Sequence, residues 1–163
     1  MPFCSEHVSW LYRLESNYSW QSSLPIAEDV AFQDKNGKVR LILEQGGRIT
    51  VTRGYAWNGC SPKFCFFDLI LGTPDGVVDP RTGHAKTWCA SLVHDALYQF
   101  VPDGLPLRRA QCDRCFLELL RLDGFRLRGI YWAAVRIFGG LVRRGIRRAR
   151  QTRGTKLVLE SAA

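Results

Sequence analysis

The stretch VAFQDKNGKVRLILEQGGRITVT, residues 30–52, decides the first half of the fold. Residues 30–34 and 39–43 flank Asn36-Gly37, a dipeptide that accepts the positive φ angles of a tight hairpin turn. Gly46-Gly47 makes a second turn before the segment 49–52. We therefore expect a small antiparallel β-meander, with strands over about 8–53 because residues 10–14 also alternate weakly.

The rest of the chain divides into a loop and three helices. Gly, Pro, Asn and Asp are dense from 54 to 85, which predicts irregular backbone. Helices are expected over about 86–100, from after Pro106 to about 123–124, and over about 128–150 with an interruption or close packing at Gly139-Gly140. The fold class is α+β: one domain over 1–150 with an antiparallel pair of helices, and a flexible tail over 151–163.

Composition excludes several classes of protein. The chain has 163 residues, of which 46% are hydrophobic and 23% charged, as in one globular domain. No apolar run reaches the roughly 18 residues of a membrane-spanning helix, and the first residues lack the pattern of a secretory signal. Glycine-rich nucleotide loops are also absent from the sequence, so no nucleotide cofactor is expected.

Positive charge is concentrated in the second half. Residues 1–84 carry 8 basic and 9 acidic side chains, whereas residues 85–163 carry 15 basic and 6 acidic ones. The third expected helix is amphipathic and rich in arginine, which favours contact with an anionic membrane surface or another polyanion. The alternative is that this arginine-rich segment is only the solvent-exposed end of a helix, with no binding partner. The expected contact residues are Arg136, Arg143, Arg144, Arg147, Arg148 and Arg150.

The first two helices carry the residues most suited to chemistry. His94 and Tyr98 are four residues apart and therefore neighbours on one helix. Asp113 falls in the apolar stripe of the next helix, where a carboxylate is costly unless it is paired. We expect it to bond His94 or Tyr98. Such a bond fixes the imidazole tautomer and leaves the other ring nitrogen free to act as a base. The same bond is equally expected if the contact is a purely structural clasp that holds the two helices together.

Four ordered motifs resemble a bacteriophage and prophage domain family of unknown function over about residues 40–140. They are the sequences GYAWNGCSP at 54–62, VHDALY at 93–98, RAQCDRCF at 109–116 and AVRIFGG at 134–140. The family has Asp where this chain has Asn58, and Ala where it has Cys60. The resemblance implies a phage or prophage origin and supplies no mechanism.

The two helices also resemble the catalytic pair of phospholipase A2-type lipid hydrolases. By that resemblance His94 is the base, Asp113 orients it beside Tyr98, and Asp95 holds Ca²⁺. The loop 55–60 would complete the oxygen cage that Ca²⁺ prefers. Its ligands would be the backbone of Trp57 and Gly59 and the amide of Asn58.

Cysteines leave three alternatives open. Most buried free cysteines are simply small hydrophobic residues, which is the first expectation here. Zinc or an iron–sulfur cluster is the second, and disulfides are the third. The candidate metal ligands are Cys60, Cys65, Cys112 and Cys115.

Two main functions follow from the sequence. The first is a virion-associated, tail-associated or lysis-stage hydrolase that attacks host phospholipid esters with a Ca²⁺-assisted His–Asp pair. The second is a non-enzymatic virion or tail protein that binds other virion proteins, in which the His–Asp–Tyr cluster only clasps two helices. A regulator that binds nucleic acid through the arginine-rich end is a third reading. The expected location is the virion or the infected bacterial cell.

Overall fold

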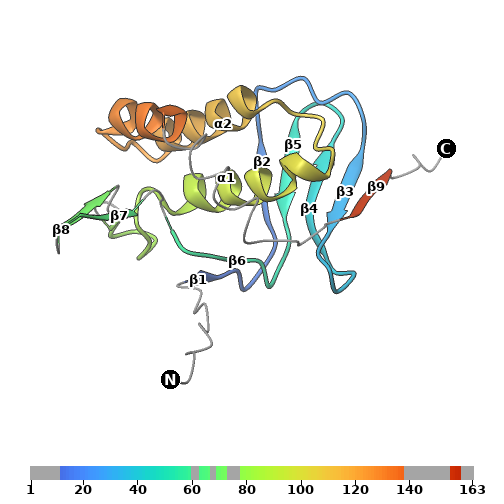
Figure 1. Cartoon of the computed structure of the whole chain (residues 1–163), viewed down its shortest axis with the longest axis horizontal. Coiled ribbons are helices and arrows are strands. Elements are labelled where there is room, and N and C mark those ends of the chain that lie inside the picture. The colour runs from blue at the N-terminus through green and yellow to red at the C-terminus, as the bar shows by residue number, and fades with distance from the viewer. Residues whose placement is uncertain (1–11, 60–62, 67–68, 73–77, 138–154, 159–163) are drawn as a thin grey trace.

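A computed structural model of the chain describes residues 12–59, 63–66, 69–72, 78–137 and 155–158, without the side chains of 63–66, 69–72, 155 and 158. The predicted α+β class is confirmed: antiparallel strands fill the first half, and helices follow them along the chain (Figure 1). The helices lie against one face of the main sheet.

The main sheet has five antiparallel strands in the order β2-β5-β4-β3-β9. The β3–β4 turn contains the expected Asn36-Gly37, with Gly37 at a φ of 72°, and the Asp34 carboxylate accepts the backbone N–H groups of Asn36 and Lys38. The predicted meander is therefore correct for β3 to β5. The strands are β2 (Tyr18–Gln21), β3 (Val30–Gln33), β4 (Val39–Glu44), β5 (Arg48–Val51) and β9 (Thr155–Val158).

Two segments contain strands that the sequence analysis did not expect. The central segment 54–85 contains β6 (Ala56–Trp57), which pairs with β1 (Tyr12–Arg13), and the antiparallel pair β7 (Lys63–Phe66) and β8 (Leu69–Gly72). The tail expected to be flexible contains β9, which pairs with β3 at the edge of the sheet. In both places the strands form by pairing between segments, which local turn chemistry does not reveal.

Three α-helices follow the strands. The first, α1 (Trp88–Phe100), continues into the short 3₁₀ helix η1 (Val101–Asp103) and stops at Gly104, whose φ is 86°. The second, α2 (Arg109–Leu122), begins where the Gln111 side chain accepts the backbone N–H of Arg108. The third helix is described over 128–137, and its expected continuation to 150 lies outside the described residues.

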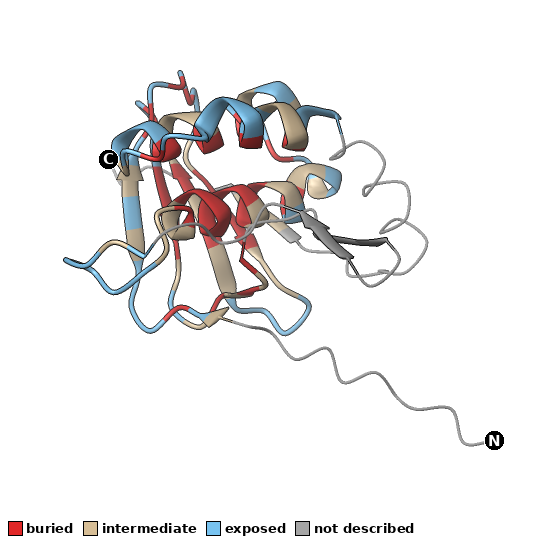
Figure 2. Ribbon diagram, turned by 90° about the vertical axis from the view of Figure 1, so that its left-hand side faces the viewer, coloured by how far each residue is buried: buried red, intermediate tan, exposed pale blue. Residues whose placement is uncertain are grey.

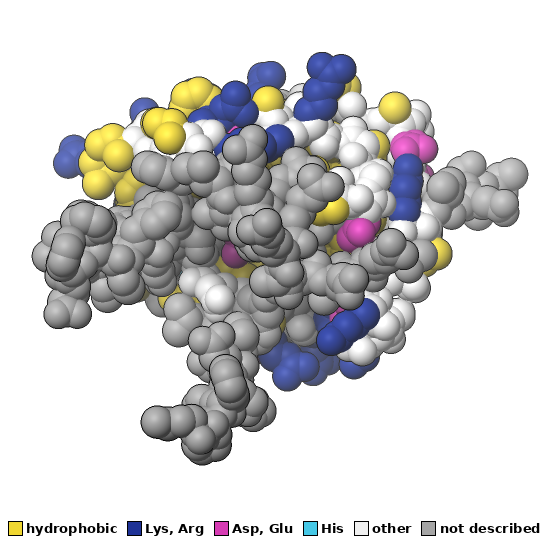
Figure 3. Space-filling model, viewed as in Figure 1, with side chains coloured by type: hydrophobic (Ala, Val, Ile, Leu, Met, Phe, Trp, Pro, Cys, Tyr) yellow, Lys and Arg dark blue, Asp and Glu magenta, His cyan; other side chains and the backbone are white. Residues whose placement is uncertain are grey.

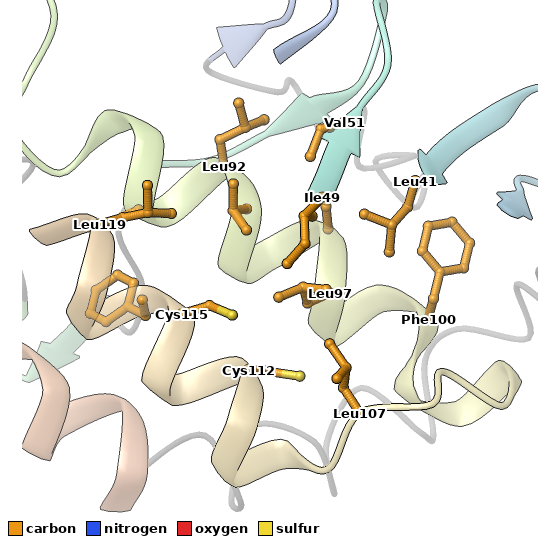
Figure 4. Packing of buried hydrophobic residues seen from close by; sticks show 14 of the residues in the cluster. Leu41, Ile49, Val51, Leu92, Leu97, Phe100, Leu107, Cys112, Cys115 and Leu119 are labelled. Atoms are coloured by element: carbon orange, nitrogen blue, oxygen red, sulfur yellow. The ribbon is translucent and has the colours of Figure 1, made fainter. Parts of the chain in front are cut away.

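The core lies where α1 meets the sheet on one side and α2 on the other. Buried residues line α1 and the facing strands (Figure 2). Phe32 of β3 and Phe100 of α1 have ring centroids 5.2 Å apart. On the opposite side, Cys112 and Cys115 point from α2 toward α1 (Figure 4). Because α1 is enclosed in this way, its polar side chains must find partners inside the protein.

Candidate functional site

Asp113 is fully buried on the face of α2 that turns inward. The sequence pattern predicts an apolar stripe of Ala110, Phe116, Leu117 and Leu120, and this is only partly correct, because Ala110 is exposed and Leu117 is half-buried. The position of Asp113 within the buried face is nevertheless as expected. The other buried residues of α2 are Cys112, Cys115, Phe116, Leu119 and Leu120.

One carboxylate oxygen of Asp113 meets α1. His94 Nε2 lies 3.1 Å from Asp113 Oδ1, and the Tyr98 hydroxyl donates a short hydrogen bond to the same oxygen. The rings of His94 and Tyr98 have centroids 4.1 Å apart, as neighbours one helical turn apart should. The expected contact between Asp113 and the preceding helix is therefore present.

The other carboxylate oxygen meets two arginines. Arg136, on the third helix, donates from Nη1 to Asp113 Oδ2 over 3.1 Å. Arg109, one turn before Asp113 on α2, has its Nε 3.8 Å from the same oxygen. Asp113 therefore joins α1, α2 and the third helix, and we call these five residues the Asp113 network: His94, Tyr98, Arg109, Asp113 and Arg136.

Arg109 is the functional residue that the sequence reasoning missed. Its Nε donates to the Tyr98 hydroxyl oxygen over 2.8 Å, and its Nη2 donates to the Val135 carbonyl oxygen over 2.9 Å. It thus bridges α1 to the third helix as well as flanking Asp113. The available signal was the spacing of four residues between Arg109 and Asp113, which places the two side chains on one helical face.

Hydrogen bonding keeps Asp113 ionised. Burial alone would raise the pKa of its carboxyl group, but the hydrogen bonds from His94, Tyr98 and Arg136 outweigh burial and lower it. The pKa of the Tyr98 phenol is raised by burial and by its bond to the carboxylate, so it stays protonated and donates. With a carboxylate acceptor at Nε2, the favoured neutral tautomer of His94 carries its proton there and its lone pair on Nδ1.

His94 itself is enclosed. Only 7% of the residue is exposed, and its ring packs against Tyr98 on one side and Phe116, 5.0 Å away between centroids, on another. An imidazole that activates water must reach that water and a substrate. The contacts around His94 instead resemble those of a packed core side chain.

The loop expected to hold Ca²⁺ lies against the start of α1. Trp57 is buried, and its Nε1 donates to the Ser91 hydroxyl, four residues before Asp95, over 3.2 Å. Asn58 and Asp95 are both half-buried, and Gly59 has a φ of 74°. The structure places Trp57 beside the helix that carries Asp95, while a shared Ca²⁺ site for these residues stays a prediction.

The two cysteines of α2 are buried free thiols. Burial raises the pKa of Cys112 to about 12, and burial also raises that of Cys115, so both stay protonated at neutral pH. Cys60 and the side chain of Cys65 lie outside the described residues. Within the described part of the chain, no three His, Cys, Asp or Glu side chains gather as a metal site would require.

Of the arginines expected to touch a polyanion, only Arg136 lies within the described residues. Its side chain is 42% exposed, and its guanidinium group is paired with Asp113. The other expected contacts, Arg143, Arg144, Arg147, Arg148 and Arg150, lie outside them.

Asp123, at the carboxyl end of α2, is a second carboxylate in an unfavourable setting that the sequence reasoning missed. Burial raises the pKa of Asp123, and the nearby Asp79 raises it further. Its Oδ2 atom is buried without a hydrogen-bond partner among the residues described.

Among the described helices, none combines the length and the apolar run needed to cross a bilayer. Comparison with known protein families, with curated proteins and with solved structures finds no match for the chain.

Proposed function

We propose that the protein is a non-enzymatic interaction protein of a phage particle, in which the Asp113 network clasps three helices. One observation carries the non-enzymatic part: only 7% of His94 is exposed and its ring packs against Tyr98 and Phe116, so the imidazole has little access to a water or a substrate. The phage origin is supported by the four ordered motifs in the sequence.

The energetic role of such a network is structural. A buried carboxylate without partners costs several kcal/mol, so its donors must be held in place whenever the protein is folded. Here the donors reside on helices that are separated in sequence, and Arg136 belongs to a helix whose inner side buries only Tyr131 and Val135 among its described residues. The network therefore fixes the third helix on the domain and sets which of its sides faces outward.

A specific observation favours the phospholipid hydrolase as a second candidate. His94 meets Asp113 through Nε2, so its Nδ1 carries the lone pair that a general base uses. Asp95 follows His94 directly, as the resemblance to phospholipase A2-type enzymes requires of the Ca²⁺ ligand. The two candidate functions differ in the role of His94, which either acts as a base on a substrate or only stabilises the fold.

One experiment separates them. Purified wild-type protein, His94→Gln and Asp95→Asn are incubated with phosphatidylglycerol vesicles, in millimolar Ca²⁺ or in chelator, and released fatty acid is measured together with thermal unfolding. Asp79→Asn, which alters an ion pair with the exposed Arg81 away from the Asp113 network, is the control.

If the protein is a non-enzymatic interaction protein, no fatty acid is released above the control reaction. His94→Gln then melts at a lower temperature, because the Gln side chain does not replace the imidazole ring packed against Tyr98 and Phe116. Ca²⁺-dependent release that disappears in both His94→Gln and Asp95→Asn, and survives in Asp79→Asn, would overturn this proposal and establish the hydrolase.

A further inference from the structure

Large apolar side chains are exposed together on one part of the surface. Six large hydrophobic residues are exposed within the described residues, and five of them lie between 122 and 137. Soluble proteins expose single apolar residues everywhere, but a group of bulky ones marks a binding surface. The four most exposed of the five are Leu122, Leu127, Ile130 and Ile137, with exposed fractions of 52–70%.

Helical geometry places three of these residues, Leu127, Ile130 and Ile137, on one side of the third helix, whereas Leu122 lies on α2 beside Trp20 and Ser23. At 100° per residue, Ile130, Ala134 and Ile137 fall within an arc of about 60° on the third helix. Tyr131 and Val135, next to that arc, are buried against the domain. The apolar surface of the helix is therefore wider than its contact with the domain, and the remainder faces outward.

Arginines lie close to this apolar side in the sequence. Arg126 and Arg128 are exposed, and no acidic residue occurs between 124 and 137. Apolar and basic side chains lie side by side over the end of the molecule where α2 and the third helix run (Figure 3). We call this combination the lipid face: Leu127, Ile130 and Ile137 with Arg126 and Arg128.

We propose that the lipid face docks on the surface of a bilayer containing anionic phospholipid. This inference rests on the proposed function and names the partner of the helix that the Asp113 network holds. Bulky aliphatic side chains enter the boundary between headgroups and acyl chains, while neighbouring arginines pair with lipid phosphates. Charge complementarity favours this occupant over a second copy of the chain, because two copies would bring the same arginines together.

The helix is held ready for this contact. Arg136 binds Asp113, and Arg109 donates to the backbone carbonyl oxygens of Val135 and Arg136. The lipid face is thus oriented by the fold before it meets a membrane, so little conformational freedom is lost on docking. A nucleic acid would use the arginines but would have no use for the exposed Ile130 and Ile137, which makes lipid the better fit.

The test is sedimentation of the full chain with vesicles of phosphatidylcholine alone or mixed with phosphatidylglycerol, at low and high salt. The apolar variant is Ile130→Ser/Ile137→Ser, and its control is Val78→Ser, an exposed apolar residue elsewhere. The charge variant is Arg126→Gln/Arg128→Gln.

For the charge variant, Arg48→Gln/Arg53→Gln on the other half of the chain is the control, since both arginines are exposed there. Circular dichroism of every variant shows that it is folded.

We expect binding that requires phosphatidylglycerol and weakens with salt. The apolar variant should bind at least about tenfold more weakly, from the loss of buried methyl and methylene groups. Each arginine removed should cost about fivefold at low salt. Both controls should bind like the wild type.

Three results would overturn the proposal. The first is equal binding to both kinds of vesicle, and the second is a loss in the charge variant with none in the apolar variant, which describes a general polyanion contact such as DNA. The third is a dimer in sedimentation velocity without lipid that the apolar variant dissociates, which assigns the face to a second copy. Hydrolysis and melting measurements test the proposed function separately, so failure of one is distinct from failure of the other.

Discussion

Replacing Asp113 by Asn tests the clasp most directly, because the two side chains have the same shape and no cavity is created. The bonds from His94 and Tyr98 change from charge-assisted to neutral, which costs about 1 kcal/mol each. The new amide group also faces the Arg136 donor, and since that side chain is 42% exposed and can rehydrate, we assign this about 1 kcal/mol more. The free energy of unfolding should therefore fall by about 3 kcal/mol.

For a chain of this size, 1 kcal/mol corresponds to roughly 2–4 °C in melting temperature, so Asp113→Asn should melt about 6–12 °C lower. The assay is thermal unfolding at pH 7 by circular dichroism, with urea unfolding as a second measure. Glu28→Gln is the matched control, because Glu28 is exposed and its pair with Lys156 lies outside the Asp113 network, and its melting temperature should stay close to the wild type. A melting temperature for Asp113→Asn within about 2 °C of the wild type would refute the clasp.

Three further predictions concern acid stability, Asp123 and the turn before β5. Because the pKa of Asp113 is lowered in the fold, its carboxylate contributes fully to stability above the ordinary pKa of about 3.9, and this contribution is lost as the pH falls through the lower folded pKa. The free energies of unfolding of wild type and Asp113→Asn, measured with urea, should therefore converge below about pH 4. A gap that stays constant with pH would contradict this. Because the pKa of Asp123 is raised in the fold, this residue stabilises the protein only at low pH, and its contribution is lost as the pH rises through the folded pKa. Asp123→Asn should therefore raise the free energy of unfolding at pH 7 by about 1 kcal/mol. A melting temperature below that of the wild type would refute this. Gly47→Ala places a Cβ 2.7 Å from the Leu24 carbonyl oxygen and should lower the free energy of unfolding by more than about 3 kcal/mol. Gly46→Ala meets nothing within 4 Å and should lower it by about 1 kcal/mol. Equal melting temperatures for the two variants would show that the loop moves to make room for the Cβ.

Local chemistry made part of the fold predictable. Asn36-Gly37 indicates a hairpin because only few residues accept its backbone angles, and the structure has β3 and β4 on either side of it. The pairing of β9 with β3 joins 155–158 to 30–33, and no local pattern in either segment names the other as its partner. The short strands β6 to β8 were missed for the same reason, because Gly and Pro mark turns without showing which segments pair.

In the candidate site too, local sequence features made some contacts predictable and left others unpredictable. Asp113 was identifiable because a carboxylate at a helical core position needs a partner, and helix order made His94 and Tyr98 the nearest choices. Arg136 was expected to face a polyanion. The sequence shows that this arginine lies on an amphipathic helix, but it does not show which neighbouring helix the side chain contacts. Its pairing with Asp113 depends on how the third helix packs, which is a tertiary property.

The Asp113 network and the lipid face meet on the third helix, and this permits a prediction with an unusual sign. Asp113→Asn removes a negative charge, so electrostatics alone predicts tighter binding to vesicles that contain phosphatidylglycerol. The clasp predicts the opposite: without the carboxylate, Arg136 and Arg109 lose the acceptor that fixes the helix carrying Ile130 and Ile137. We therefore expect Asp113→Asn to bind such vesicles more weakly than the wild type, by a factor of about three to ten, at a temperature where circular dichroism shows the same helix content for both. Tighter binding, with helix content unchanged, would mean that the third helix keeps its orientation without Asp113 and that the network does not govern the surface it presents.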